Sequence, residues 1–292
     1  MKYKLINGTK EDFNLVESLL RKIKKEPAMI FEEKFRKNEL INYFLISNNT
    51  KIIGVFISVE LSGEFINYLS LKENINDEII FEEIYQNIRA IQSVNPSSEV
   101  CLNFCLDNSS AILFFQKKGI IINDASGYEM SISITNPSQF CKSRNLLFRA
   151  YDYENIDKYV EIENKAFAKL MNGKESISEH VKPNYANYLQ EKNKINQFGA
   201  YEFENEIVGI MYMGNDYTIR TLAVLPKFQG RGFGKMIVFD WLNRYAKIYP
   251  EITEIKLHVD EKNKSAFNFY KKIGFKQTGS FSENTFSNKT EK

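Results

Sequence analysis

A weak internal repeat constrains the fold of this chain more than any other feature. The segments 108–120 and 263–275 match without a gap at Asn, Ser, Ala, Phe, Lys and Gly, 155 positions apart (108 to 263). The segments 3–13 and 146–156 also agree in kind, because each opens with a short apolar strand and continues into a Thr or Asp suited to cap a helix. Two long copies indicate tandem domains rather than a solenoid of many short repeats. The 292-residue chain is therefore predicted to fold as two similar domains.

Polar residues and a lapse of periodicity mark the expected boundaries. They gather between the two copies, so we expect a linker at 136–145, one domain at 1–135 and another at 146–280. The last residues, 281–292, are polar with little strand pattern and are expected to form a tail.

Composition narrows the class of protein. Hydrophobic residues make up 43% and charged residues 26% of the chain, as in folded globular proteins. The net charge of +2 gives no reason to expect nucleic acid or a membrane as partner. No apolar run reaches the ~18 residues of a membrane helix, and the N-terminus leads into a strand rather than a signal peptide. We therefore expect a cytoplasmic protein.

The three cysteines do not suggest a metal site. Cys101, Cys105 and Cys141 include no Cys-x-x-Cys pair, and the first two lie among apolar residues. Reduced, buried thiols are expected, with no bound metal.

Both halves show a similar order of strand and helix patterns. The second half predicts strands near 146–150, 197–203, 207–213, 219–225 and 255–259, and helices near 153–167, 175–192, 236–242 and 265–273. The first half predicts strands at 3–6, 43–47, 51–59, 64–71, 99–104 and 128–134, and helices near 77–93 and 109–118. This order predicts a mixed α/β (α+β) fold, with a mixed, mostly antiparallel sheet flanked by helices in each half.

A glycine-rich turn follows one of these strands. The strand-like run 219–225 leads to Gln229-Gly-Arg-Gly-Phe-Gly234, after which a helix pattern begins. Gly230, Gly232 and Gly234 leave the backbone N–H groups uncovered, and the helix adds its own unpaired N–H groups and the positive end of its dipole. The turn is suited to hold an anion such as a phosphate or pyrophosphate.

Three motifs at this spacing resemble the GNAT acetyltransferase superfamily. The turn fits that family's Gln/Arg-x-x-Gly-x-Gly/Ala acyl-CoA loop, and Leu222-Ala-Val224 is similar to the strand before it. Asn263-x-x-Ala-x-x-x-Tyr-x-x-x-Gly-Phe275 resembles the family's later helix. The resemblance covers about 146–280 and extends to 1–135 only through the internal repeat, so it implies two tandem GNAT-like domains. A Rossmann loop would need a different glycine spacing and an acidic residue about 20 positions on.

The resemblance implies acetyl-CoA as co-substrate and an amine as acceptor. Loop amides would bind the pyrophosphate, the preceding strand and a later Asn would contact the pantetheine arm, and two basic side chains would add positive charge. In this chain these positions are Gln229, Gly230, Arg231, Gly232, Phe233 and Gly234 for the loop, Leu222, Ala223, Val224 and Asn263 for the arm, and Arg231 and Lys235 for the charge. A solvated basic rim is the alternative for Lys235.

Tyr270 is the expected general acid. The resemblance places its phenol at the thioester sulfur, and a phenol of pKa ~10 is able to protonate a departing thiolate of pKa ~8.5. A core role is the alternative, because Phe267 and Tyr270 are three residues apart on one helix.

The general base is left open by the sequence. Some GNAT enzymes carry a glutamate on the strand before the loop, where this chain has Thr218, and Asp216 lies close by. Glu163 shares a helical face with Ile156 and Val160, so its carboxylate points where apolar side chains point. It is the base, an anchor for the substrate amine, a partner in a salt bridge, or a carboxylate at the edge of the helix face.

The first half lacks the features of the loop. At the 155-residue offset the loop falls on 74–79, which has no glycine and contains Asp77 and Glu78, and Tyr270 falls on Phe115. We expect this half to keep the fold, to have lost acetyl-CoA binding, and to pack as one subunit of a pseudo-dimer that walls the acceptor site. A homodimer is the other possible assembly.

The closing strand of the second sheet is also open. The first half offers 128–134 as a last strand, whereas the second half has no clear counterpart. Its sheet either ends one strand short, has a short strand near 285–287, or borrows a strand from the other half.

The leading functional hypothesis is an N-acetyltransferase. Its C-terminal domain would transfer acetyl from acetyl-CoA directly to an amine of a small molecule or peptide. The alternative is a non-catalytic acyl-CoA-binding sensor or scaffold, which is favoured by Thr218 at the position where some GNAT enzymes carry a glutamate. An acyl group larger than acetyl is a third possibility.

Overall fold

The chain divides into two compact units. The computed structural model describes residues 3–48, 51–118, 121–136 and 146–286. One unit comprises 1–129, 259–261 and 277–292, and the other comprises 130–258 and 262–276. Most of the expected linker, with Cys141, and the last part of the expected tail, 287–292, lie outside the described residues.

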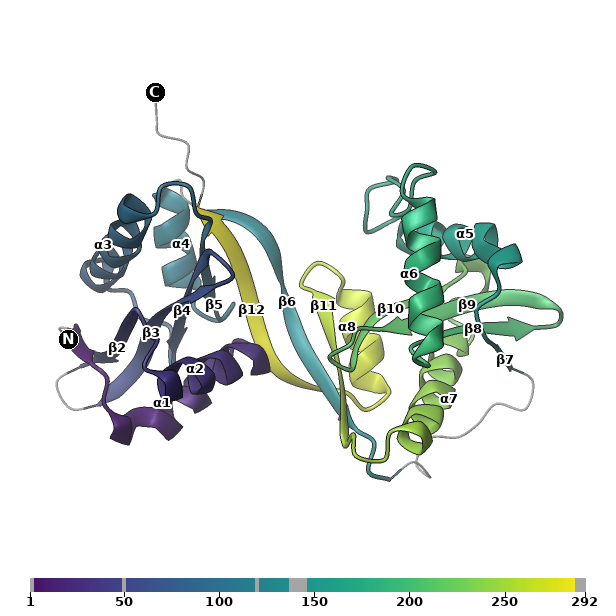
Figure 1. Cartoon of the computed structure of the whole chain (residues 1–292), viewed down its shortest axis with the longest axis horizontal. Coiled ribbons are helices and arrows are strands. Elements are labelled where there is room, and N and C mark those ends of the chain that lie inside the picture. The colour runs from purple at the N-terminus through teal and green to yellow at the C-terminus, as the bar shows by residue number, and fades with distance from the viewer. Residues whose placement is uncertain (1–2, 49–50, 119–120, 137–145, 287–292) are drawn as a thin grey trace. The chain divides into compact units, whose positions relative to one another are not determined.

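The first unit holds a mixed sheet with helices on both faces (Figure 1). Its strand order is β1-β2-β3-β4-β5-β12-β6, and all neighbours from β1 to β12 are antiparallel except the parallel pair β4–β5. The elements are β1 (Lys4–Asn7), α1 (Phe13–Leu20), α2 (Lys25–Lys37), β2 (Asn42–Ser47), β3 (Ile52–Leu61), β4 (Glu64–Leu71), α3 (Glu78–Val94), β5 (Val100–Phe104), α4 (Ser109–Lys117), β6 (Ile121–Ser133) and β12 (Lys276–Phe286).

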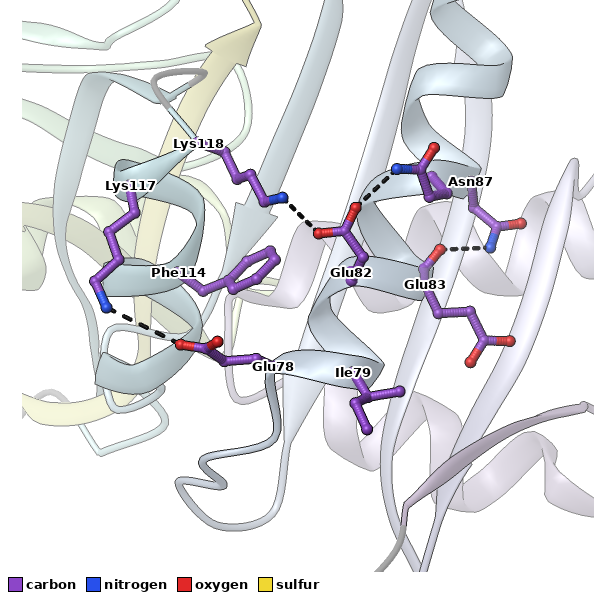
Figure 2. A pocket seen from close by; sticks show the side chains of 9 residues that line it. Glu78, Ile79, Glu82, Glu83, Asn87, Phe114, Lys117 and Lys118 are labelled. Atoms are coloured by element: carbon purple, nitrogen blue, oxygen red, sulfur yellow. Dashed lines mark hydrogen bonds and ion pairs between the residues drawn. The ribbon is translucent and has the colours of Figure 1, made fainter.

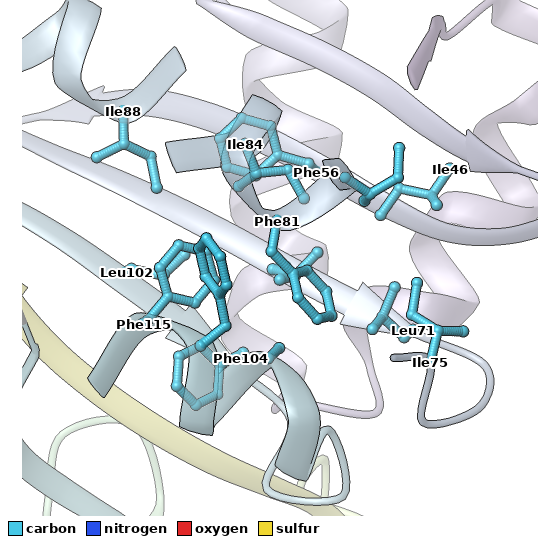
Figure 3. Packing of buried hydrophobic residues seen from close by; sticks show 14 of the residues in the cluster. Ile46, Phe56, Leu71, Ile75, Phe81, Ile84, Ile88, Leu102, Phe104 and Phe115 are labelled. Carbon is cyan, nitrogen blue, oxygen red and sulfur yellow. The ribbon is translucent and has the colours of Figure 1, made fainter. Parts of the chain in front are cut away.

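Alternation along β3 separates the two cores of this unit. Val55 and Ile57 pack with α1 and α2, whereas Phe56 between them packs with α3 and α4. Figure 3 shows the second cluster, in which Phe81 of α3 and Phe115 of α4 meet over the sheet. Both rings are buried, so the helices are fixed on the sheet by apolar packing.

The second unit repeats this arrangement. Its strand order is β6-β11-β10-β9-β8-β7, with β10 and β11 parallel. The elements are β7 (Leu147–Arg149), α5 (Ile156–Phe167), α6 (Lys182–Lys194), β8 (Phe198–Phe203), β9 (Glu206–Met213), β10 (Thr218–Val224), α7 (Phe233–Ile248), β11 (Glu254–Asp260) and α8 (Lys264–Lys272). Short 3₁₀ turns at Lys10–Asp12, Tyr153–Asn155 and Pro226–Phe228 precede α1, α5 and the glycine turn.

The two faces of the second sheet are covered by different helices. Tyr212 of β9 reaches Glu163 of α5, whereas the next residue, Met213, accepts a hydrogen bond from Trp241 of α7. Because successive side chains of a strand point to opposite faces, α5 and α7 lie on opposite sides of the sheet. The mixed α/β fold predicted from the sequence is therefore confirmed in each unit.

The last strand of each half is exchanged between the units. β12 pairs with β5 of the first unit, from Ser282 opposite Phe104 to Thr285 opposite Cys101. The end of β6, from Met130 onward, belongs to the second unit and is the neighbour of β11 there. Of the three ways left open for closing the second sheet, the structure therefore has a strand borrowed from the other half.

The polar tail expected at 281–292 is wrong for residues 281–286, which form the end of β12. They are strand, and Ser280, Ser282 and Asn284 are buried despite being polar. Asn284 Nδ2 donates to the Leu102 carbonyl at 3.1 Å, and Cys105 Sγ lies 2.9 Å from Ser280 Oγ. Hydrogen bonds of this kind permit burial that the apolar pattern does not indicate.

Some helices also differ from the sequence expectation. The helix expected from 175 begins only at Lys182, with Pro183 in its first turn, and α2 is a helix that the sequence patterns do not predict. Within the described ranges, no helix is both long and apolar enough to cross a membrane.

Candidate active site

The glycine turn lies between β10 and α7, as its sequence predicts. Gly230 and Gly232 have φ of +72° and +90°, in the left-handed region that a side chain disfavours. Nothing lies within 4 Å of a Cβ added at either position, so backbone conformation and not space requires glycine there. The turn thus brings an uncovered stretch of backbone to the start of α7.

A run of N–H groups is available at this turn. Gly232 is the N-cap of α7 and offers no side chain to cap it. Among the described residues, no protein acceptor is bonded by the backbone N–H groups from Gly230 to Lys235, and the first helical bond is that of Met236 to Gly232. An anion is the chemical partner that suits this stretch.

The two parallel strands beside the turn separate from one another. β10 and β11 pair only at Thr218 with Lys256 and at Ile219 with Leu257, although both strands continue and are fully described. The remainder of β10 is therefore paired on one edge alone, by β9.

The free edge of β10 presents the amides of Leu222 and Val224. Leu225 N donates to Val208 O of the neighbouring β9 side. Bonding alternates along an antiparallel ladder, so Leu222 and Val224 direct their N–H groups away from β9. Gln229 Nε2 occupies the Val224 carbonyl at 2.8 Å, which ties the turn to the strand. An extended chain lying along this edge would find peptide donors, as an added strand does.

Two basic side chains flank the turn. The Arg231 guanidinium lies 5.5 Å from the Phe228 ring centroid and 5.6 Å from that of Phe233. Lys235 Nζ lies 5.1 Å from the Phe239 ring centroid. Among the described residues neither cation has a carboxylate within 4 Å, so both add uncompensated positive charge. Phe233 itself is buried, and only its backbone faces the turn.

α8 lies against the first turn of α7. A Cβ on Gly234 would stand 3.2 Å from Cζ of Phe269, the neighbour of Tyr270. Asn263 is the N-cap of α8, and its Oδ1 accepts from Ala266 N at 3.1 Å. Its carbonyl is therefore occupied by the helix, which leaves only the Nδ2 group for a ligand.

Tyr270 is mostly buried beside aromatic rings. It is 8% exposed, and its ring packs against Phe269 and Phe275 at centroid distances of 5.0 and 5.3 Å. Burial raises the pKa of its phenol, so the side chain stays protonated at neutral pH. No hydrogen-bond partner of its oxygen occurs within the described part of the chain.

Glu163 is a buried carboxylate held by tyrosines. It accepts from Tyr185 Oη at 2.7 Å and from Tyr212 Oη at 3.2 Å. Burial raises its pKa more than these two hydrogen bonds lower it. Since no cation lies within 4 Å of it among the described residues, the salt-bridge interpretation left open by the sequence is wrong.

Asp216 lies in the turn before β10 and is a weaker candidate for a base. Burial opposes ionisation, but hydrogen bonding from Thr218 and the charge of Arg220 lower its pKa overall. Thr218 Oγ1 and Arg220 Nη2 donate to it at 2.9 and 3.1 Å. This carboxylate is thus held ionised and already paired.

The side chains around Glu163 are functional candidates that the motifs in the sequence do not indicate. Tyr185, Tyr188 and Lys192 of α6 lie on the face that packs on the sheet, and Tyr188 meets Tyr212 ring to ring at 5.6 Å. Their spacing of three, four and seven residues was a detectable signal of a shared helical face. A helix predicted to begin at 175 does not by itself show which of its faces packs on the sheet, so this shared face was not identified from the sequence.

The counterpart of the turn in the first unit is built differently. Asp77 caps α3 with its own side chain, which accepts from the amides of Ile79 and Ile80. β4 and β5 stay paired from Phe65 with Val100 through Leu69 with Phe104, so no free edge opens. Phe115 at the position of Tyr270 is fully buried and has no proton to give.

A cavity lies between α3 and α4 of this first unit. Its volume is about 880 Å³, and Glu78, Glu82 and Glu83 line it together with Lys117 and Lys118 (Figure 2). Both lysines point to glutamates, Lys118 to Glu82 at 2.5 Å and Lys117 to Glu78 at 4.0 Å. The cavity thus carries more acidic than basic groups, which does not suit a phosphate ligand. Over the same described ranges, no group of three or more His, Cys, Asp or Glu side chains is arranged to hold a metal ion.

Comparisons with known proteins agree with this geometry. Residues 151–288 match the family model described as "Acetyltransferase (GNAT) domain". A curated relative, "Peptidyl-lysine N-acetyltransferase YjaB" of Salmonella typhimurium, is 37% identical over 76 residues, which cover 26% of this chain and 47% of the relative. The aligned stretch thus spans about half the length of that protein.

Solved structures extend the fold similarity to the whole chain. A GCN5-related N-acetyltransferase from Sphaerobacter thermophilus has a TM-score of 0.53 at 13% identity, covering 99% of this chain and 97% of that one. A conserved protein of unknown function from Staphylococcus epidermidis has a TM-score of 0.50 at 14% identity, covering 82% of this chain and 93% of that one. At such identity the likeness concerns fold alone. The family match thus identifies residues 151–288 as a GNAT acetyltransferase domain.

Proposed function

We propose that the protein is an N-acetyltransferase whose single acyl-CoA site lies in the C-terminal domain, and that it transfers acetyl directly to an amine. The observation that carries the proposal is the opening between β10 and β11 beside a turn of unpaired amides. Amides from Gly230 to Lys235 bind the pyrophosphate, with Arg231 and Lys235 adding charge. The Gln229 amide, expected from the sequence to join them, instead donates to the Pro226 carbonyl at 3.1 Å. Leu222, Ala223 and Val224 support the pantetheine arm through the free edge, and Asn263 contacts it through Nδ2.

The chemistry needs one acid and one base. The amine nitrogen attacks the thioester carbonyl, the C–N bond forms, and the C–S bond breaks. Tyr270 gives its proton to the departing sulfur, and the raised pKa of its phenol keeps that proton in place until then. Glu163 receives the proton of the amine, directly or through the tyrosines bonded to it, because burial makes it more basic than an ordinary carboxylate.

The first unit serves structure rather than donor binding in this proposal. The first amides of its helix α3 are already bonded by the Asp77 side chain. Its strands β4 and β5 stay paired and leave no free edge, and Phe115 stands at the position of the proposed acid. The domain organisation expected from the sequence, one degenerate and one active GNAT-like domain, is retained on these grounds. The exchanged strands shift its boundaries, since 277–286 belong to the first unit.

Acetyl-CoA turnover with a panel of amines tests the activity. The expected result is amine-dependent release of CoA that Tyr270→Phe lowers by about 10²-fold or more, the usual contribution of general acid catalysis. Tight CoA binding without turnover for any amine would instead support a sensor or scaffold. Parallel assays with longer acyl-CoA donors distinguish acetyl from larger acyl groups.

A further inference from the structure

The site contains a separated pair of charges on the α5–α6 side of the second sheet. Glu163 carries the negative charge and has no cation within 4 Å among the described residues. Lys192 carries the positive charge and has no carboxylate within 4 Å over the same ranges. Buried charges are normally paired, so two unpaired opposite charges in one region need a reason.

Lys192 is held in place by neutral groups. It is 7% exposed, and Nζ donates to Gln197 Oε1 at 3.2 Å and to Asn215 Oδ1 at 2.6 Å. Burial and the nearby Arg220 lower its pKa, while Asp216 opposes that shift. Amide oxygens orient the ammonium but leave its charge uncompensated.

Arg220 extends the positive end to the surface. It pairs with Asp216 at 3.1 Å through Nη2 alone, and its side chain is 46% exposed. Gly214 makes room for it, since a Cβ there would stand 2.6 Å from Arg220 Nε. Among the described residues Asp216 pairs directly with Arg220 and not with Lys192, so this end of the site carries more positive than negative charge.

Aromatic rings separate the two ends. Lys192 Nζ lies 5.3 Å from the Tyr188 ring centroid, and Tyr188 packs on Tyr212 at 5.6 Å, whose hydroxyl in turn bonds Glu163. Tyr188 is 40% exposed, and burial raises the pKa of its phenol, while the nearby Arg220 opposes that shift and Glu163 adds to it. Tyr212 lies opposite Thr221 of β10, so the negative end is next to the strand with the free edge.

We propose that the acceptor is a zwitterion, with a primary amine that docks at Glu163 and an anionic group several bonds away that docks at Arg220, supported by Lys192. The inference rests on the proposed function and names its acceptor class. Two tyrosine rings between the charges set the spacing, which suits an aliphatic ω-amino acid better than an α-amino acid. Complementary charges of this kind select a substrate and exclude one that lacks the anion.

The test compares 6-aminohexanoate with n-hexylamine, which has the same chain and no carboxylate. We expect kcat/KM to be about tenfold higher for 6-aminohexanoate, as one charge-assisted contact allows. Arg220→Gln should lower kcat/KM for 6-aminohexanoate about tenfold more than for hexylamine. Arg149→Gln is the control, because Arg149 is an exposed arginine of the same unit paired with Glu202.

Equal rates for the two amines in the wild type would overturn the proposal and point to an acceptor without an anion, such as a peptidyl lysine. Persistence of the preference in Arg220→Gln would overturn it too. Calorimetric binding of both amines to the enzyme saturated with CoA separates this result from a failure of the proposed function. Tighter binding of 6-aminohexanoate supports the zwitterion site even without turnover, whereas equal or undetectable binding of both at millimolar concentration contradicts it.

Discussion

Gly234 and Phe269 touch so closely that a β-carbon on Gly234 would stand 3.2 Å from Phe269 Cζ. Gly234 belongs to the turn whose amides are free, and Phe269 precedes Tyr270 on α8. The contact therefore couples the position of the proposed donor site to that of the proposed acid.

Gly234→Ala should disturb donor binding and catalysis together. The added methyl group displaces Phe269, and overpacking of this kind costs about 1–3 kcal/mol. We expect a higher KM for acetyl-CoA and a lower kcat, measured by CoA release. A change in KM alone would show that α8 does not depend on this contact.

Gly232→Ala should weaken CoA binding through backbone strain. At φ of +90° an alanine costs about 1–2 kcal/mol, which the turn relieves by leaving the conformation that exposes its amides. Gly63→Ala is the matched control, since Gly63 has φ of +89°, also with nothing within 4 Å of a Cβ, and lies in the first unit. Both variants should lose similar stability in denaturant, but only Gly232→Ala should lose affinity in calorimetry.

Glu163→Gln should change the pH dependence of the reaction. A base with a raised pKa makes kcat/KM increase with pH through that raised value, so the variant should lose this acidic limb and about 10²–10⁴-fold of the rate. Glu161→Gln on the same helix is the control, because Glu161 is a half-exposed carboxylate paired with Lys158 and Lys165. An unchanged limb in Glu163→Gln would remove Glu163 from the mechanism.

The same variant should alter stability in a defined direction. Burial raises the pKa of Glu163 in the folded protein, so between the ordinary and the raised value the folded state binds more protons than the unfolded chain. The free energy of unfolding therefore falls as pH rises through this window, and Glu163→Gln removes that fall. In urea titrations at several pH values, the free energy of unfolding of the variant should rise relative to that of the wild type as pH increases.

Removing residues 277–292 should destabilise the first unit, although most of that unit lies more than 150 residues earlier in the chain. Without β12, β5 loses its antiparallel partner and Lys24, which is buried, loses Glu283. Hydrogen exchange should then lose protection in β5 and in α2. Retained protection there would mean that β12 does not pair in solution as it does in the structure.

Glu283→Gln is the milder variant. It should lower the free energy of unfolding by about 1–3 kcal/mol, because it leaves Lys24 without its ion-pair partner.

Much of this fold follows from local patterns, and the exchange of strands does not. Alternation and glycine turns predict β3, β4 and β10 within a few residues, because each strand has a clear apolar face. Which sheet the last strand joins depends on long-range pairing. β12 also lacks an apolar alternation that would reveal it, because its buried Ser282 and Asn284 are polar residues satisfied by hydrogen bonds.

The candidate site divides in the same way. The turn and Tyr270 are legible because motif spacing is local, and the position of Glu163 among apolar neighbours follows from one helical face. Its partners could not be predicted, because Tyr185 and Tyr212 come from α6 and β9 and meet it only through the packing of those elements on α5.

A crystal structure with acetyl-CoA tests the central claim most directly. The account predicts one molecule per chain, with its pyrophosphate on the amides between Gly230 and Lys235, its pantetheine arm along Leu222 and Val224, and its sulfur within hydrogen-bond reach of Tyr270 Oη. Acetyl-CoA bound at residues 74–79 before α3, or a second unit left empty at saturating acetyl-CoA, would contradict it.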